Sequence, residues 1–194
     1  MPFTLYSDFT TAECYALNEQ IASLGVGASV RWKGVQHAPG MPEPMRTFDR
    51  RGQDQMADEV EMIRRIDPAL AIHVPAARPN SSKAIVAAAA VMLKAAARAP
   101  GFRDAIYRAY WRDGVDISSM AELHRLADQA GVPRFVDLSH PDGVELAEEW
   151  DLDWSTERLG GVPRVIRGDG KILWGFRPHA DAAQFFSGAS TGGR

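Results

Sequence analysis

The sequence predicts an α/β protein in which an all-helical insertion separates a second strand from a C-terminal hairpin. Three features predict it: a strand-helix-strand opening, a long central stretch with helical periodicity, and a return to strand patterning near the C-terminus. A strand-helix-strand opening favours two parallel strands joined by a right-handed crossover. We therefore expect the two ends of the chain to contribute to one sheet.

The opening elements are short and sharply bounded. A strand over residues 2–6 holds three large apolar side chains, and a helix is expected from about 11 to 23. Gly25 follows that helix and is typical of a helix end. A second strand, rich in valine and tryptophan, is predicted over 28–35.

A proline-rich loop over 36–53 leads into the helical stretch. Apolar residues at helical spacing predict helices over 54–66, 81–98, 100–113, 119–131 and 139–150. The second of these is apolar almost all round, which predicts a buried central helix. Ser119 and Glu122 form a capping-box pattern at the start of the fourth.

Strand patterning returns after Gly160-Gly161. Residues 163–167 and 171–176 flank Gly168-Asp169-Gly170, which predicts a hairpin, and Pro178 begins a last helix. The complete order is that of a thioredoxin-like fold with an insert. We expect a thioredoxin-like domain over 1–50 plus 155–194, and a helical insert domain over 54–150.

Composition narrows the classes of function. The chain has 194 residues, a net charge of -3 with both signs interspersed, and one cysteine, Cys14. One cysteine excludes an internal disulfide and a cysteine-based zinc site, and no two histidines are spaced i, i+4. The sequence has no cluster of basic residues of the kind that binds nucleic acid. It also has no apolar run with the length and flanking residues of a membrane span or a leader. We expect a cytoplasmic, metal-free protein without nucleic-acid or membrane partners.

Residues 6–15 read Tyr-Ser-Asp-Phe-Thr-Thr-Ala-Glu-Cys-Tyr. This stretch resembles the strand-to-helix turn of DsbA-like thioredoxin-fold proteins, a group that includes 2-hydroxychromene-2-carboxylate isomerases and kappa-class glutathione transferases. In the dithiol members the turn reads Ser-Asp-Phe-x-Cys-x-x-Cys-Tyr. Residues 79–81, 116–118 and 161–163 also resemble family segments, so the resemblance extends along most of the chain.

The departure from the dithiol pattern decides what chemistry the resemblance implies. Thr11 stands where the first cysteine would be, and Cys14 where the second would be. A threonine cannot exchange disulfides. In the glutathione-dependent members a serine at this position bonds the thiolate of glutathione, so the resemblance implies that the Thr11 hydroxyl steers a cofactor thiolate.

Other interpretations of the same turn stay open. Thr10 and Glu13 have the spacing of a capping box, and Thr11 fits a structural helix start. Cys14 is expected to be an inert buried thiol or else a reactive monothiol that forms a sulfenic acid or a glutathione adduct. A carboxylate at Glu13 disfavours a thiolate nearby.

The resemblance implies further binding residues. Val162-Pro163 would hold a cis peptide bond facing the active-site helix, and Val162 would pair with the cysteinyl unit of glutathione or with a peptide. Thr10 is expected at the same cofactor site. Arg177 stands where glutathione-binding members have a polar segment, and it would bind a carboxylate or else remain solvated.

Asn80 and Phe9 are the expected substrate-binding residues, with a plain helix cap as the alternative for Asn80. The leading hypothesis is a glutathione-linked isomerase or transferase acting on a small electrophilic or aromatic substrate. A monothiol redox protein using Cys14 and a non-catalytic thioredoxin-fold binding module are the alternatives. The expected partner is a small molecule, and a homodimer stays open.

Overall fold

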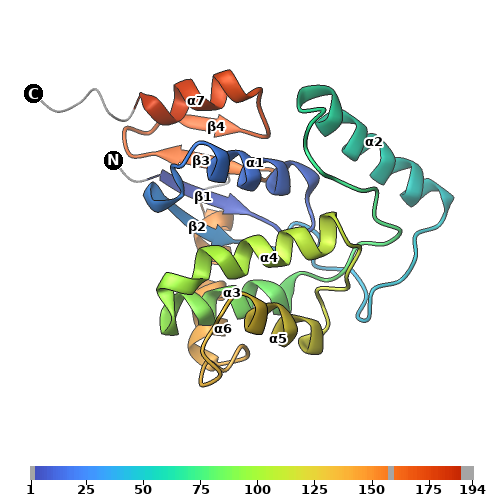
Figure 1. Ribbon diagram of the computed structural model, residues 1–194, viewed down its shortest axis with the longest axis vertical. Helices are drawn as coiled ribbons and strands as arrows, with labels where there is room; N and C mark the ends of the chain where they lie inside the picture. Colours follow the sequence, from blue (N-terminus) through green and yellow to red (C-terminus); the bar gives the residue numbers. More distant parts are fainter. Residues whose placement is uncertain (1–2, 157–159, 189–194) are drawn as a thin grey trace, which may run out of the picture.

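The protein is built on a four-stranded mixed sheet with strand order β2-β1-β3-β4 (Figure 1). The computed structural model describes residues 3–156 and 160–188. The strands are β1 (Phe3–Ser7), β2 (Val30–Gly34), β3 (Arg164–Arg167) and β4 (Ile172–Trp174). β1 pairs in parallel with β2 and antiparallel with β3, and β3 pairs antiparallel with β4. The two ends of the chain thus share one sheet, as the sequence predicts.

The helices occupy the predicted places. They are α1 (Ala12–Ser23), α2 (Arg50–Ile66), α3 (Ser82–Lys94), α4 (Ala99–Trp111), α5 (Met120–Gln129), α6 (Pro141–Thr156) and α7 (His179–Ser187). α2 to α6 lie between β2 and β3 in the chain, and a single bridge between Thr47 and Ala77 is the only strand-like pairing described there. An α/β fold with a helical insertion is confirmed.

Most elements begin within two residues of the predicted start, and local structure explains the difference at the second strand and at α2. The second strand starts at Val30, because residues 27–29 form a turn of 3-10 helix. α2 starts at Arg50 rather than at residue 54, because the Asp49 carboxylate accepts a hydrogen bond from the Gly52 N–H at 2.8 Å. An aspartate at this position satisfies a backbone donor that the helix itself cannot.

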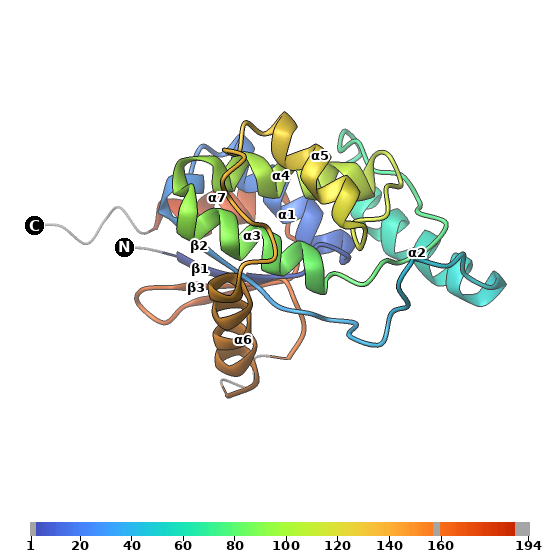
Figure 2. The ribbon, with the colours of Figure 1, turned by 90° about the horizontal axis from the view of Figure 1, so that it is seen from below.

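α6 is longer than predicted and lies alone on one side of the sheet, opposite α1 and α7 (Figure 2). It ends at Thr156, six residues past the expected end at 150. The added turns carry Trp154, whose ring lies 5.3 Å from that of Tyr6 in β1. One turn earlier, the Trp150 ring lies 5.6 Å from that of Trp32 in β2.

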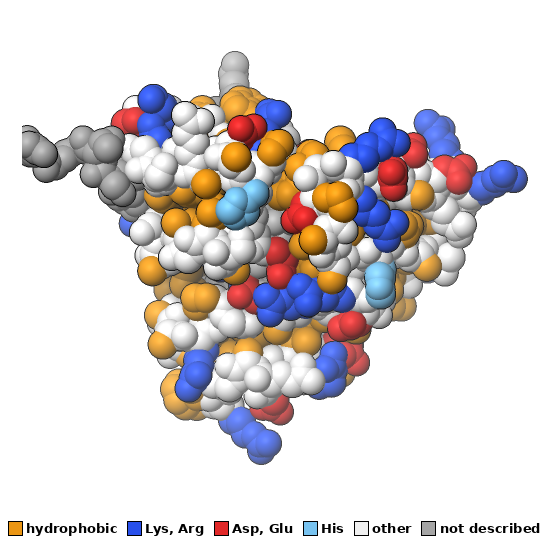
Figure 3. Space-filling view, turned by 45° about the horizontal axis from the view of Figure 1, so that its top comes forward, with side chains coloured by type: hydrophobic (Ala, Val, Ile, Leu, Met, Phe, Trp, Pro, Cys, Tyr) orange, Lys and Arg blue, Asp and Glu red, His pale blue; other side chains and the backbone are white. Residues whose placement is uncertain are grey.

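The buried side chains form one continuous core that includes both the sheet and the helices of the insertion. The division into domains over 1–50 plus 155–194 and 54–150 stays a prediction, and its residues 1–2, 157–159 and 189–194 lie outside the described part. On the face shown in Figure 3, basic side chains lie next to acidic ones. Within the described ranges, every helix is too short or too polar to cross a membrane.

Candidate functional site

The candidate site begins where β1 passes into α1. The Asp8 carboxylate, which is fully buried, accepts hydrogen bonds at one oxygen from the Thr10 N–H (3.0 Å) and the Thr10 hydroxyl (3.2 Å). The predicted capping box between Thr10 and Glu13 is therefore wrong. The Thr10 hydroxyl is used by the aspartate two residues earlier, a local turn that competes with helix capping.

Thr11 is the residue that precedes the first turn of α1. Its backbone is extended (φ -105°, ψ 125°), and its side chain makes no capping hydrogen bond. The Thr11 hydroxyl oxygen is buried and has no hydrogen-bond partner among the described residues. The backbone N–H groups of Ala12 and Glu13 also lack partners in the described structure, as is usual for the first turn of a helix.

A cavity of about 240 Å³ opens in front of this turn. Its walls come from the start of α1, the segment after β2, α2, the loop before α3 and the residue two before β3. The lining residues are Thr11, Ala12, Glu13, His37, Glu59, Met62, Arg78 and Val162. The structure thus brings Thr11 and Val162 together, although 150 residues separate them in the chain.

Val162 lines this cavity and has unused backbone groups. The Val162–Pro163 peptide bond is cis, and the Pro163 carbonyl accepts a hydrogen bond from the Gly175 N–H at 3.0 Å. Neither the N–H nor the C=O of Val162 takes part in a hydrogen bond with any described residue. An unused donor and acceptor on one residue can pair with the backbone of an extended ligand.

Glu13 is the carboxylate nearest the helix start. Burial raises the pKa of Glu13, while the charge of Arg177 and the N–H of Phe176 lower it in part. Gly175 approaches this carboxylate so closely that a Cβ there would lie 3.2 Å from Glu13 Oε2, and its φ of 66° also favours glycine. Glu13 is thus held half-buried at the cavity and takes up a proton more readily than an exposed glutamate.

The opposite wall carries an ion pair that the sequence analysis missed. The Arg78 guanidinium donates to both carboxylate oxygens of Glu59, at 2.7 and 3.0 Å. Glu59 belongs to α2 and Arg78 to the loop before α3, so only the tertiary packing brings them to the cavity. Arg78 directly precedes the family-like segment over 79–81, and that is the one signal that could have pointed to it.

A scan against protein families matches residues 4–186 to the DsbA-like thioredoxin domain. The chain belongs to the DsbA-like thioredoxin domain family. The comparison with curated proteins found no match.

Solved structures of DsbA-like proteins share the fold. A probable DsbA oxidoreductase from Streptomyces coelicolor has a TM-score of 0.75 at 16% identity and covers 100% of this chain and 92% of its own. A 2-hydroxychromene-2-carboxylate isomerase has a TM-score of 0.71 at 17% identity, covering 98% and 95%. The cytosolic disulfide reductase DsbM from Pseudomonas aeruginosa, solved with GSH, has a TM-score of 0.70 at 14% identity, covering 98% and 94%.

In this DsbA-like chain Cys14 lies behind the cavity, not in it. Cys14 is 0% exposed, and its sulfur accepts a hydrogen bond from the Asp8 N–H at 3.4 Å. Burial raises the pKa of the Cys14 thiol far above its ordinary value, and hydrogen bonds with Ser7 and Asp8 offset only part of that rise. The thiol is therefore protonated and shielded in the folded protein.

The remaining expected site residues of the DsbA-like domain lie outside the cavity lining. Phe9 is fully buried, with its ring 5.2 Å from Trp32 and 4.7 Å from Tyr107. Arg177 is exposed and donates from Nε to the Trp174 carbonyl at 2.9 Å. Neither Phe9 nor Arg177 therefore lines the cavity at Thr11.

Asn80 ties the segment after β2 to the start of α3. Its amide oxygen accepts from Gln36 Nε2 (2.6 Å) and from the Ser82 N–H (3.0 Å). Its amide nitrogen donates to the carbonyls of Pro39 (3.2 Å) and Met41 (3.0 Å). The residue that caps α3 is Ser81, so Asn80 is not the plain helix cap of the alternative interpretation, although it accepts from the Ser82 N–H. Substrate contact by Asn80 stays a prediction.

Proposed function

We propose that this protein binds glutathione, or a thiol peptide of the same kind, in the cavity between Thr11 and Val162. It acts there on a small electrophilic or aromatic substrate as an isomerase or a transferase. When bound, glutathione would supply a thiolate nucleophile. The observation that carries the proposal is that one cavity is lined by Val162, Ala12 and Glu13, whose backbone groups have no partner among the described residues.

These groups suit the two parts of a cysteinyl unit. The N–H and C=O of Val162 can pair with the backbone of an extended peptide. The free N–H groups of the first turn of α1, and the dipole of its 12 residues, favour an anion at the helix end. A thiolate placed there would lie beside Thr11, as in the resemblance to the glutathione-dependent members.

The Thr11 hydroxyl must turn to reach such a thiolate. In the structure its oxygen is buried and unpaired, so turning it toward the cavity breaks no hydrogen bond of the described protein. A hydroxyl that donates to a charged acceptor contributes about 1.5–3 kcal/mol. A turn to another staggered rotamer avoids the strain of an off-rotamer side chain, so the bond to a thiolate can contribute to binding.

Other side chains of the cavity fit charged parts of the ligand and proton transfer. Arg78 can pair with a peptide carboxylate in exchange for part of its contact with Glu59. Glu13, whose pKa is raised by burial, can give a proton to the substrate and take it back. Cys14 has no part in this chemistry because it is shielded and protonated.

Two of the solved structures support the proposal by analogy. DsbM was solved with GSH, and another structural neighbour is an isomerase. We further propose action in the reducing cytoplasm, since the lone cysteine leaves no pair for a structural disulfide within the chain.

One observation favours a binding module without catalysis. The Glu13 carboxylate lines the same cavity, and a negative charge raises the pKa of a nearby thiol. In such a site the thiol of a bound peptide would stay protonated and would not act as a nucleophile. Binding measured apart from turnover separates the two functions.

The test is thermal unfolding with glutathione and with S-methylglutathione, followed by conjugation of 1-chloro-2,4-dinitrobenzene. A ligand at about 100 times its Kd should add about 2.7 kcal/mol of stability. We expect both peptides to raise the Tm and only glutathione to support turnover, with Cys14→Ala as active as the wild type. If neither peptide raises the Tm, the proposal is contradicted. If Cys14→Ala loses turnover, Cys14 takes part in the reaction and the proposed role of bound glutathione is wrong.

A further inference from the structure

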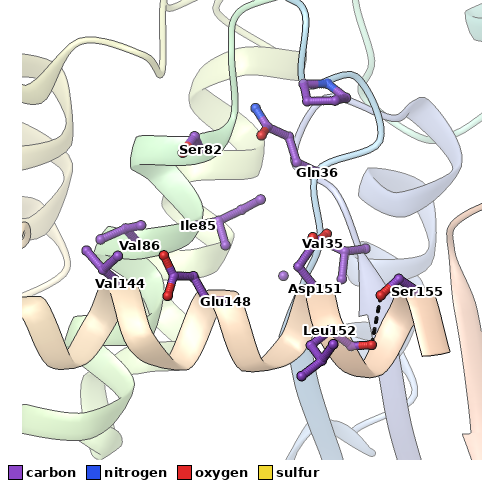
Figure 4. A pocket seen from close by; sticks show the side chains of 13 residues that line it. Val35, Gln36, Ser82, Ile85, Val86, Val144, Glu148, Asp151, Leu152 and Ser155 are labelled. Atoms are coloured by element: carbon purple, nitrogen blue, oxygen red, sulfur yellow. Dashed lines mark hydrogen bonds between the residues drawn. The ribbon is translucent and has the colours of Figure 1, made fainter. Parts of the chain in front are cut away.

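Two cavities are lined in part by the segment that follows β2, and their charged side chains are placed differently. The larger, of about 440 Å³, lies between the end of β2, the start of α3 and α6 (Figure 4). Its two carboxylates, Glu148 and Asp151, point apart, so they do not converge on one group of a ligand. The smaller cavity, at Thr11, has Glu13 and Arg78 on different walls, so these two side chains can meet the two ends of one ligand.

The Glu13 carboxylate lies next to the strand end that pairs with the cis-proline. The Gly175 N–H donates to the carbonyl of Pro163, the residue after Val162, at 3.0 Å. A Cβ at Gly175 would lie 3.2 and 3.4 Å from the two carboxylate oxygens of Glu13. A peptide that pairs with the backbone of Val162 and extends toward Gly175 would therefore meet this carboxylate.

Glu13 has no cation paired with it in the described structure. None of the ion pairs found among the described residues includes it. Burial raises the pKa of Glu13 and the charge of Glu59 adds to the rise, whereas the charge of Arg177 and the N–H of Phe176 offset it in part. A half-buried carboxylate of this kind is stabilised by a cation that a ligand brings.

The other wall offers the opposite charge. Both bonds from Arg78 to Glu59 come from the same nitrogen, Nη2, and Nε of Arg78 has no partner among the described residues. This guanidinium therefore has donors left for a carboxylate. Glutathione has the matching polarity, because its glycyl end is a carboxylate and its glutamyl end carries an ammonium group, on either side of the cysteinyl unit.

We infer that Glu13 binds the ammonium group of the glutamyl residue of glutathione, with the glycyl carboxylate directed to Arg78. This role depends on the proposed function, because it needs glutathione in the cavity at Thr11. The ammonium offsets the negative charge that Glu13 would otherwise place beside the thiolate. It also favours the ionised form of Glu13, which assists the transfer of the Glu13 proton to the substrate. Glu13 thus selects thiol peptides that carry an ammonium group.

The experiment compares S-methylglutathione with S-methyl-N-glutarylcysteinylglycine, which lacks only the ammonium group. Methylation removes the charge of the thiolate, so the comparison reports the ammonium alone. In calorimetric titrations the wild type should bind S-methylglutathione about three- to tenfold more tightly, as a partly buried ion pair allows. In Glu13→Gln the two peptides should bind equally, because a neutral amide does not favour the ammonium.

A second measurement uses the same two peptides with free thiols. In the wild type, binding should lower the thiol pKa more for glutathione than for N-glutarylcysteinylglycine, because only glutathione offsets the charge of Glu13. In Glu13→Gln the two shifts should be equal. A difference that persists in Glu13→Gln overturns the pairing of Glu13 with the ammonium.

Asp181→Asn is the control, because it makes the same change of charge in the first turn of α7 at a residue that does not line the cavity. It should keep the wild-type preference for S-methylglutathione. Equal binding of the two peptides by the wild type overturns the role of Glu13. A full preference in Glu13→Gln, or an equal loss in Asp181→Asn, does so too. The proposed function stands in these cases, since both peptides still bind. If neither peptide binds the wild type, the proposed function fails and the role of Glu13 fails with it.

Discussion

The carboxylate of Asp8 accepts a hydrogen bond from the backbone N–H of His37 at 2.6 Å. Asp8 follows β1 and His37 follows β2, so this bond joins the ends of two parallel strands at the candidate site. The other oxygen of the same carboxylate holds Thr10 through two bonds. Asp8 thus positions both the turn before Thr11 and the His37 wall of the cavity.

Asp8→Asn should destabilise the protein. An amide accepts at one oxygen only, so its NH2 group would face a backbone donor of either Thr10 or His37. Losing one hydrogen bond to a charged acceptor costs about 1.5–3 kcal/mol. Urea unfolding measures the change, with Asp137→Asn, an exposed local turn, as the control. Equal stability of Asp8→Asn and the wild type would show that these bonds contribute nothing net.

Cys14 should react slowly with Ellman's reagent in native buffer. Its side chain is fully buried, and burial raises the pKa of the thiol, so very little thiolate is present near neutral pH. The rate should rise to that of a small free thiol in about 6 M urea, where the chain is unfolded. A native rate as fast as that of free cysteine would contradict the buried position.

Thr11→Ala should leave stability nearly unchanged, because the Thr11 hydroxyl makes no capping bond and has no partner among the residues described. If the hydroxyl turns to a bound thiolate, the same variant should raise the pKa of glutathione in the complex by roughly one to two units. Thr11→Ser keeps the hydroxyl and should behave like the wild type. The ultraviolet absorbance of the thiolate reports this pKa. Identical titrations for all three proteins would show that Thr11 does not contact the cofactor thiol.

Glu13→Gln should stabilise the protein at neutral pH and have little effect at about pH 4. Burial raises the pKa of Glu13 above its ordinary value of 4.5, so the folded state holds the proton more tightly than the unfolded chain does. The stability that this carboxyl contributes is full below its unfolded-state pKa and is lost as pH rises through the folded-state pKa. Urea unfolding at the two pH values tests this, with the exposed Glu145→Gln as the control. A gain that is equal at both pH values would point to a cause other than ionisation.

Gly143→Ala and Gly101→Ala should change stability in opposite directions. Each glycine is the third residue of its helix, α6 and α4 respectively. A Cβ at Gly101 meets no atom within 4 Å, so the alanine should add up to about 0.5–1 kcal/mol by reducing backbone entropy. A Cβ at Gly143 would lie 3.0 Å from the Val86 carbonyl oxygen and from Ala90, which forces α6 away from α3. Denaturant midpoints compare the two, and a stabilising Gly143→Ala would show that the helices adjust freely.

The fold could be predicted because its signals are local. The turn over 168–170 fixes the hairpin, and the change of periodicity on either side of the insertion marks the helices. The capping of α5 was also predictable, since the Ser119 hydroxyl accepts from the Glu122 N–H. The same pattern failed at Thr10, because pattern reasoning does not show that Asp8 takes the hydroxyl first.

The candidate site was less accessible to sequence reasoning, because it forms between distant segments. Thr11 and Val162 were joined only through the family resemblance. Glu59 and Met62 lie on α2, whose pattern predicts a helix but not which wall it forms. The close approach of α6 to α3 at Gly143 could not be predicted either, because it is a contact between segments far apart in the sequence.

The pairing of β1 with β3 has a consequence for synthesis on the ribosome. Tyr6 is opposite Arg164, so the sheet cannot close until the helical insertion has been translated. At about 5–20 residues per second, the intervening roughly 160 residues take on the order of 8–30 s. During that time one edge of the β1–β2 pair has no native partner and can pair with strands of other chains. The insertion therefore sets how long this edge of β1 stays uncovered while the chain is being synthesised.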